Sequence, residues 1–363
     1  VQEVLKLASC LGFSFDLDTL QLIVVGEYQN LTGKERLPGW TEKDALPSDC
    51  STSETYKDIL FNLLSKAQKH GILVPGRTPY SYNFSHDKIF ACIYSALPTG
   101  IERKELHVRI GHRLLDAYPT NEYVQFCALD QMNQGAESIT KTTDREELVR
   151  LNLKTMKLAS KHSAFVRAQD YAASALSLFP NDGLWQVDYD LALDLHTVAA
   201  EAMAVNQSPE GLVDKVVLHS QTVEDKIPAS TILMTYYGWN HRFDESLDAG
   251  VALLKLLGEK IPRKAGKLHM VWELTRAMKD VKRMSDEELL ALPVAKDKNK
   301  SVIMKTLYLM YSAAFCTNPD LMLVLALRAF RISLRHGIEP EVTPFVFSTF
   351  GICHEYMKNL AES

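Results

Sequence analysis

This sequence lacks the patterns by which proteins hold nucleic acids, cross membranes or enter the secretory pathway. Lys and Arg are scattered along its 363 residues without a long basic run, and the net charge is −5. A nucleic-acid surface is therefore not expected, because neutralisation of phosphates supplies most of the affinity in such complexes. No stretch of about 18 residues is free of charge, as a membrane-spanning helix requires, and the N-terminus lacks the regions of a signal peptide. We expect a cytoplasmic protein that binds neither nucleic acid nor membrane.

Cysteines are few, and no two stand at the spacing of a metal or redox motif. The six are Cys10, Cys50, Cys92, Cys127, Cys316 and Cys353. All but Cys50 fall in apolar, helix-like context. This pattern predicts reduced and mostly buried thiols.

Motifs for catalysis are also missing. Gly33-Lys34 is followed by Glu35 and lacks the earlier glycine of a phosphate-binding loop, so the chain alone is not expected to hydrolyse a nucleotide. His354 has Lys358 four residues on, where a zinc-protease helix needs a second histidine. No serine lies in a Gly-x-Ser-x-Gly elbow. We predict no enzyme activity, no catalytic residue, no metal site and no cofactor in this chain alone.

The first 98 residues contain a helical pattern interrupted once by a β-prone segment. Apolar spacing predicts helices at 1–11, 17–28, 54–70 and 85–97. Residues 72–84 form two β-prone runs around a Gly-Arg-Thr-Pro turn, which predicts the only β-hairpin of the chain. Residues 29–53 are rich in Gly, Pro and polar residues and are predicted to be a disordered insertion. This order, three helices followed by a hairpin and a fourth helix, is typical of a winged-helix-like module, which we assign to 1–98.

Only helical signals follow residue 98. The predicted helices are 100–118, 121–134, 144–162, 164–179, 183–205, 209–224, 229–239, 243–258, 266–283, 300–316, 320–337 and 342–360. The segments 164–180 and 243–256 have the small-residue spacing of tetratricopeptide (TPR) second helices, which bury their faces against neighbouring units. We predict a mainly α fold in which 99–363 is a TPR-like α-solenoid, with an irregular helical domain as the alternative.

One short motif stands apart from this helical background. His86-Asp87 lies where the hairpin returns into the next helix, at a helix start that favours an acidic group and suits phosphate. Either the pair only braces the hairpin, or it senses a nucleotide held by another part of a larger protein. By contrast, His107 and His112 are five residues apart and are predicted to be ordinary residues of an amphipathic helix.

Several blocks of the sequence resemble one family. The first joins 4–12 to 15–20, the second joins the Phe-Ser-His-Asp block of 82–89 to 94–98, and the third is 106–115. The segments 151–154, 164–178 and the turn 337–340 continue the match in the same order. Together they resemble the predicted STAND-class, origin-recognition-like AAA ATPase module of multidomain serine/threonine and histidine kinases, in the part C-terminal to the nucleotide-binding core. The resemblance covers nearly the whole chain apart from the insertion.

The resemblance implies an ATPase core that binds ATP or ADP with Mg²⁺ elsewhere in a longer protein, and output domains such as kinases. The first residue, Val1, is not Met and already belongs to a helical pattern, so we expect part of a longer chain. In related switch ATPases the histidine of a His-Asp motif contacts the nucleotide. The resemblance therefore implies that His86 favours the ADP-bound form and that Asp87 holds the local turn.

The leading hypothesis is a regulatory segment whose helical array binds a protein or small-molecule signal and relays occupancy to the ATPase core. Its partners would be other proteins or the ATPase and output domains of the same protein. A part of a transcription regulator is one alternative, although the 54–70 helix offers only Lys57, Lys66 and Lys69 against Glu54 and Asp58. A stand-alone helical-repeat scaffold and an enzyme are the others.

Overall fold

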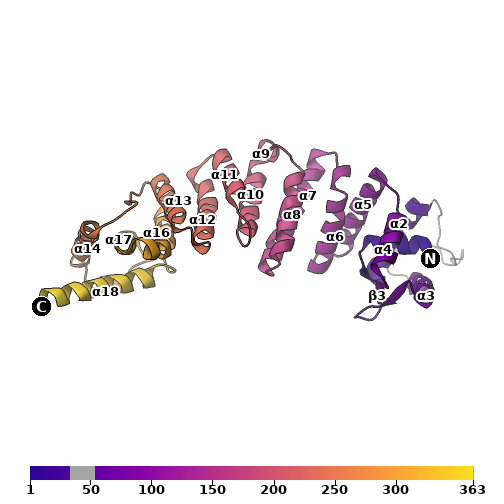
Figure 1. Cartoon of the computed structure of the whole chain (residues 1–363), viewed down its shortest axis with the longest axis horizontal. Helices are drawn as coiled ribbons and strands as arrows, with labels where there is room; N and C mark the ends of the chain where they lie inside the picture. The colour runs from indigo at the N-terminus through magenta and orange to yellow at the C-terminus, as the bar shows by residue number, and fades with distance from the viewer. Residues whose placement is uncertain (33–53, 363) are drawn as a thin grey trace. The chain divides into compact units, whose positions relative to one another are not determined.

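The structure is a computed structural model that describes residues 1–32 and 54–362, and it is mainly α-helical as predicted (Figure 1). The described residues form 18 α-helices, a 3₁₀ helix and three short strands. They divide into two compact units, and each is described by itself. Unit 1 comprises Val1–Leu158 with Asp170–Pro180, and unit 2 comprises Ala159–Gln169 with Asn181–Ser363. The predicted division into a winged-helix-like module at 1–98 and a TPR-like domain at 99–363 stays a prediction.

Unit 1 begins with the predicted order of helices and hairpin. The elements are α1 (Gln2–Cys10), β1 (Ser14–Asp16), α2 (Leu17–Thr32), α3 (Glu54–Lys69), β2 (Leu73–Pro75), β3 (Ser81–Phe84) and α4 (Asp87–Ser95). Strands β2 and β3 pair antiparallel as the predicted hairpin. A third strand that was not predicted extends this hairpin, because β1 pairs with the other edge of β3 in the order β1-β3-β2. A three-residue strand is too short for a periodic signal and forms only where a neighbouring edge accepts it.

Local chemistry accounts for the boundaries of these first elements. Gly12 has a φ of +112°, a conformation that glycine adopts without strain, and it follows Leu11, the C-cap of α1. Asp16 caps α2, since its carboxylate accepts hydrogen bonds from the backbone N–H and the hydroxyl of Thr19 at 2.8 and 2.7 Å. Helix α2 continues through Thr32, so residues 29–32 of the predicted insertion are helical. The remainder of that insertion, 33–53, lies outside the described residues.

The core of unit 1 continues beyond the hairpin into the helices that follow. These are α5 (Ile101–Ala117), α6 (Glu122–Gln134), the 3₁₀ helix Ala136–Ser138 and α7 (Thr142–Lys161). Helix α8 (Phe165–Ser177) crosses the division between the units. Phe84 is 1% exposed, and one continuous cluster joins it to Leu106, Ile110 and Leu114 of α5 and to Ala128 of α6. Burial of these apolar side chains fixes α5 and α6 to the hairpin module.

Unit 2 consists of helices, and consecutive ones pack on each other over much of its length. They are α9 (Leu184–Val187), α10 (Tyr189–Met203), α11 (Glu210–His219), α12 (Val223–Trp239), α13 (Phe243–Leu256), α14 (Lys267–Val281), α15 (Asp286–Leu290), α16 (Lys298–Thr317), α17 (Pro319–His336) and α18 (Thr343–Glu362). The pairs α10–α11, α11–α12 and α12–α13 follow chain order, which is consistent with a helical solenoid. Helix α14 departs from this order and packs against α17.

Two predicted helix boundaries in unit 2 were wrong for local reasons. The helix expected at 183–205 is interrupted at Asp188, which caps α10 by accepting from the Leu191 N–H at 3.0 Å. Helix α12 begins before Pro228, because Thr222 and Asp225 form a reciprocal capping box and the proline is carried inside the helix. A reciprocal capping box of Ser285 and Glu288 starts the short α15.

Candidate functional site around helix α4

His86 is the N-terminal cap of α4. Its backbone is extended, with φ −157° and ψ 143°, and its Nδ1 accepts a hydrogen bond from the Lys88 N–H at 3.1 Å. Asp87 is the first residue of α4, where the partial positive charge of the helix end favours a carboxylate. Both side chains are exposed. The pair therefore organises the start of α4, and its predicted contact with a nucleotide stays a prediction.

The residue before His86 anchors this start to the hairpin. Ser85 donates its N–H to the carbonyl of Ile72 at 3.0 Å and its hydroxyl to the carbonyl of Gly71 at 2.6 Å. On the other side, the Phe84 N–H bonds to the carbonyl of Phe13 at 3.0 Å. The chain is thus held on two sides just before the cap, so the position of His86 depends on the three-stranded sheet.

A buried polar chain begins at the other end of α4. The hydroxyl of Tyr94 lies 2.9 Å from Nε2 of His107, and Nδ1 of His107 lies 2.7 Å from Oε1 of Gln131. Gln131 donates its amide N–H to the carbonyl of Cys10 at 2.5 Å. Its oxygen must then accept from His107, so Nδ1 carries the proton and Nε2 accepts the hydrogen of Tyr94. This series of hydrogen bonds connects α4, α5, α6 and the end of α1.

His107 was expected to be an ordinary residue of an amphipathic helix, and the structure places it on the buried face of that helix. Its side chain is 1% exposed and lies at the centre of the series of hydrogen bonds from Tyr94 to Cys10. The sequence held no signal for this, because Gln131 stands 24 residues away and no spacing rule connects the two. The same applies to Tyr94, which lies 13 residues before His107.

Acid is expected to destabilise unit 1 through His107. Burial lowers the pKa of His107, and the charge of Arg103 lowers it further, although the bond to Gln131 raises it. The unfolded chain therefore binds the proton more readily. The stability contributed by neutral His107 is complete above about pH 6.5, the ordinary value, and is lost as the pH falls toward the lower pKa of the folded state.

The measurement is urea unfolding followed by circular dichroism at about pH 7.5 and about pH 5.5. His107→Gln should reduce the loss of stability between the two pH values. His112→Gln, which changes an exposed histidine of the same helix, should leave that loss unchanged. An NMR titration that placed the pKa of His107 at or above its ordinary value would contradict the prediction.

A second polar contact fastens α5 to α2. Glu27 has a fully buried side chain and accepts hydrogen bonds from Nε of Arg109 at 3.0 Å and Nε of Arg113 at 3.1 Å. Arg113 also donates to the carbonyl of Gly26 at 3.1 Å. A Cβ at Gly26 would meet the guanidinium of Arg113 at 2.0 Å, so only glycine allows this approach. These contacts and the His107 chain hold α5 rigidly to the hairpin module.

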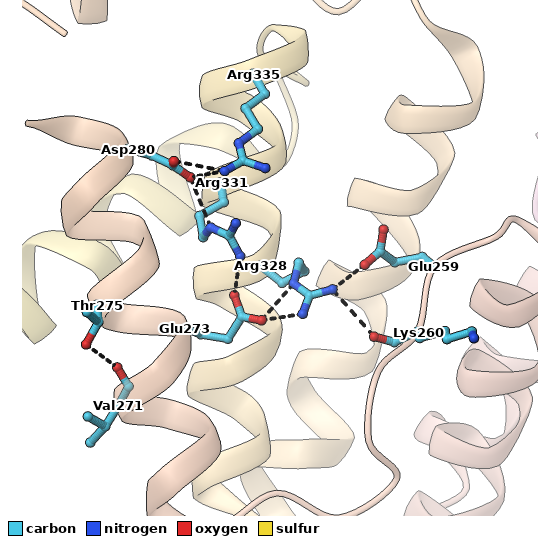
Figure 2. A network of polar contacts seen from close by, with 9 residues as sticks. All are labelled: Glu259, Lys260, Val271, Glu273, Thr275, Asp280, Arg328, Arg331 and Arg335. Carbon is cyan, nitrogen blue, oxygen red and sulfur yellow. Dashed lines mark hydrogen bonds and ion pairs between the residues drawn. The ribbon is translucent and has the colours of Figure 1, made fainter. Parts of the chain in front are cut away.

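Unit 2 contains a separate, buried network of charges between α14 and α17 (Figure 2). Glu273 is held by Arg328, with its Nε at 2.9 Å, and by Nη1 of Arg331 at 2.8 Å. Asp280 accepts from Nε of Arg331 at 3.1 Å and from Nη2 of Arg335 at 2.7 Å. Arg328 also contacts Glu259. The network joins the two helices by alternating charge.

The arginines keep both of these carboxyl groups ionised. Burial by itself would raise the pKa of Glu273, but the hydrogen bonds and charges of Arg328 and Arg331 outweigh it and hold the pKa below the ordinary value. Arg335 and Arg331 lower the pKa of Asp280 in the same way, against its burial. Each carboxylate is paired, so the network has the character of a structural connection rather than of an acid–base site.

The cysteine prediction was wrong in part. Cys10 is buried, and burial raises the pKa of its thiol to about 12, so it stays protonated. Cys92 and Cys316 are exposed, because they lie on the outer sides of their helices. Cys50 lies outside the described residues. Among the residues that the structure does describe, no group of three His, Cys, Asp or Glu side chains could hold a metal ion.

Comparison with known proteins connects the chain to a signalling protein. It is 23% identical over 300 aligned residues to the "Hybrid signal transduction histidine kinase G" of Dictyostelium discoideum. The match covers 71% of this chain and 8% of that kinase, so the chain spans a small part of its relative. No protein-family model matches, and no solved structure matches. The similarity indicates a relation to signalling proteins and leaves the STAND-class ATPase assignment a prediction. In the described parts of the chain, no helix is both long and apolar enough to cross a membrane.

Proposed function

We propose that this chain is a regulatory and interaction segment of a larger signalling ATPase, in which a winged-helix-like module relays binding on the helical array to an ATPase core. The similarity to a signal transduction kinase supports the signalling role. The observation that carries the relay is the set of contacts connected through α4. Its start is capped by His86, and near its end Tyr94 bonds to His107, which leads to Gln131 of α6.

In this proposal His86 reports the nucleotide. Because Nδ1 accepts the Lys88 N–H, the neutral ring carries its proton on Nε2, which can donate to an oxygen of ADP or ATP. The N–H groups in the first turn of α4 add a setting that favours phosphate. ATP or ADP, with Mg²⁺, would be held by the core, and this chain alone would neither bind them durably nor turn them over. Asp87 would hold the helix start, and the protein would act in the cytoplasm.

Two His86 variants separate nucleotide sensing from local bracing. The test uses the protein together with the ATPase core that the proposal assigns to it. His86→Ala removes both the cap and the imidazole, whereas His86→Asn retains a side-chain oxygen that can cap α4. If His86 senses nucleotide, both variants should release a fluorescent ADP analogue about tenfold faster, as expected for the loss of one hydrogen bond to a charged group. Stopped-flow fluorescence measures the release rate.

His70→Ala is the matched control, since His70 is another exposed histidine of the same module. It should leave the release rate unchanged. A faster release in His86→Ala alone would assign His86 to local bracing only. Unchanged release in every variant, with no ATPase activity associated with the protein, would instead favour a stand-alone helical-repeat scaffold.

A further inference from the structure

We infer that the outward face of α14 is a docking site for an acidic, amphipathic helix of a partner protein. The inference deepens the interaction part of the proposed function and rests on that part only, so it can fail or hold independently of nucleotide sensing. Two observations support it. Large apolar side chains of α14 are exposed, and both acidic side chains of α14 are engaged by α17, so the charged side chains on its outward face are all basic.

Large apolar side chains are exposed on the first half of α14. Leu268 is 86% exposed, Trp272 52% and Val271 43%. Their spacing of three and four residues places them on one side of the helix. That side lies opposite the buried Leu274 and Ala277. Figure 2 shows Val271 projecting from the side of α14 away from the network with α17. Three large exposed side chains in two turns are more than the scattered apolar residues of an ordinary surface.

The second half of the same face is positively charged. Lys279 of α14 is exposed and follows Trp272 at helical spacing, and Lys282 and Arg283 are exposed in the turn that follows the end of α14 at Val281. Arg276 lies over the Trp272 ring, with its Cζ 4.3 Å from the ring centroid, so a cation also borders the apolar half. From Leu268 to Val281 the helix is about 20 Å long at 1.5 Å per residue, which suits a partner helix of about four turns.

The charge network explains why no acid balances these cations on α14. The acidic residues of α14 are Glu273 and Asp280, and both point to α17, where three arginines engage them. The acidic side chains of α14 therefore face α17, and its exposed basic side chains face outward. A partner that covers the outward face would gain by bringing apolar side chains to Trp272 and carboxylates to Lys279 and Lys282.

A protein helix fits this face better than an anionic membrane does. Most of the exposed cations follow the apolar residues toward and beyond the end of α14, whereas a helix in a membrane interface has cations along both borders of its apolar stripe. The exposed Asp286 and Glu287 follow directly in α15 and would be repelled by anionic lipid. A peptide of four turns can end before them.

The test is selection of helical peptides from a display library on the full 363-residue chain, followed by fluorescence anisotropy with the selected peptides. We expect peptides rich in Asp and Glu with two or three large apolar residues. Trp272→Ser and the double variant Lys279→Glu/Lys282→Glu should each weaken binding at least about tenfold. A peptide in which Lys replaces its acids should bind the double variant better than the native chain.

Matched controls distinguish this face from others of the same kind. Leu218→Ser changes a side chain of α11 that is 76% exposed, and Lys255→Glu reverses an exposed cation of α13. Both should leave the affinity unchanged, and all variants should retain the native circular dichroism. Selected peptides without acidic bias, or peptides insensitive to Trp272→Ser, would overturn the inference. So would variant-sensitive binding to vesicles of phosphatidylserine and phosphatidylcholine without peptide binding, or a dimer in ultracentrifugation that Trp272→Ser abolishes.

Discussion

Replacing Glu273 with alanine is expected to destabilise unit 2 by about 3–5 kcal/mol, the cost typical of removing one partner from a buried ion pair. Glu273 is 1% exposed, and the side chain of Arg331 is 4% exposed. Without Glu273, Arg331 would keep only Asp280 as a charged partner, and Arg328 would keep only Glu259. The large effect comes from the two buried guanidinium groups, each of which loses one of its two charged partners, rather than from the net strength of the pair.

Urea unfolding followed by the fluorescence of the neighbouring Trp272 measures this loss. Arg335→Ala is the control, because the Arg335 side chain is 49% exposed and Asp280 still has Arg331. It should cost less than about 1 kcal/mol. Equal effects of the two substitutions would show that burial does not govern the network.

The same network should contribute to acid stability. The pKa values of Glu273 and Asp280 are lowered in the folded state. Their contribution is therefore complete above their ordinary values of 4.5 and 3.8, and it is lost as the pH falls through the lower folded values. Glu273→Ala should be less sensitive than the native chain to acid in that range.

Replacing Phe84 with alanine is expected to cost about 3–5 kcal/mol in unit 1, as for other large-to-small changes in a core. Phe84 is 1% exposed, and its ring centroid lies 5.4 Å from that of Phe90, 5.8 Å from that of Phe15 and 6.5 Å from that of Phe13. These rings join β3 to β1 and α4. Their loss should loosen the hairpin and the start of α4 together, so His86 should lose its fixed position.

Hydrogen exchange with mass spectrometry measures this prediction, because it reports on β3 and α4 directly. Exchange should rise in both elements while unit 2 stays protected. Val74→Ala is the control, since Val74 lies on the same hairpin and is 41% exposed, and it should change stability by about 0.5 kcal/mol or less. Protection of α4 that survives Phe84→Ala would contradict the role of the aromatic cluster.

Elements with strong local signals were predicted best. The hairpin at 72–84 was found because a turn sequence separates two β-prone runs, and it is observed as β2 and β3. Strand β1 and the interruption at Asp188 were missed, since a three-residue strand and a single cap inside an apolar helical pattern leave almost no periodic trace.

The sequence by itself determined the mainly α class, the hairpin and the place of His86-Asp87 at a helix start, because helix periodicity, turns and caps act within a few residues. Only the tertiary structure decided which polar groups meet. His107 reaches Gln131 across 24 residues, Glu27 reaches Arg109 across 82, and Glu273 reaches Arg331 across 58. Such pairs carry no local pattern, because they form only when separate helices bury their apolar faces against one another. The same packing turned both acids of α14 toward α17 and left its outward face positive.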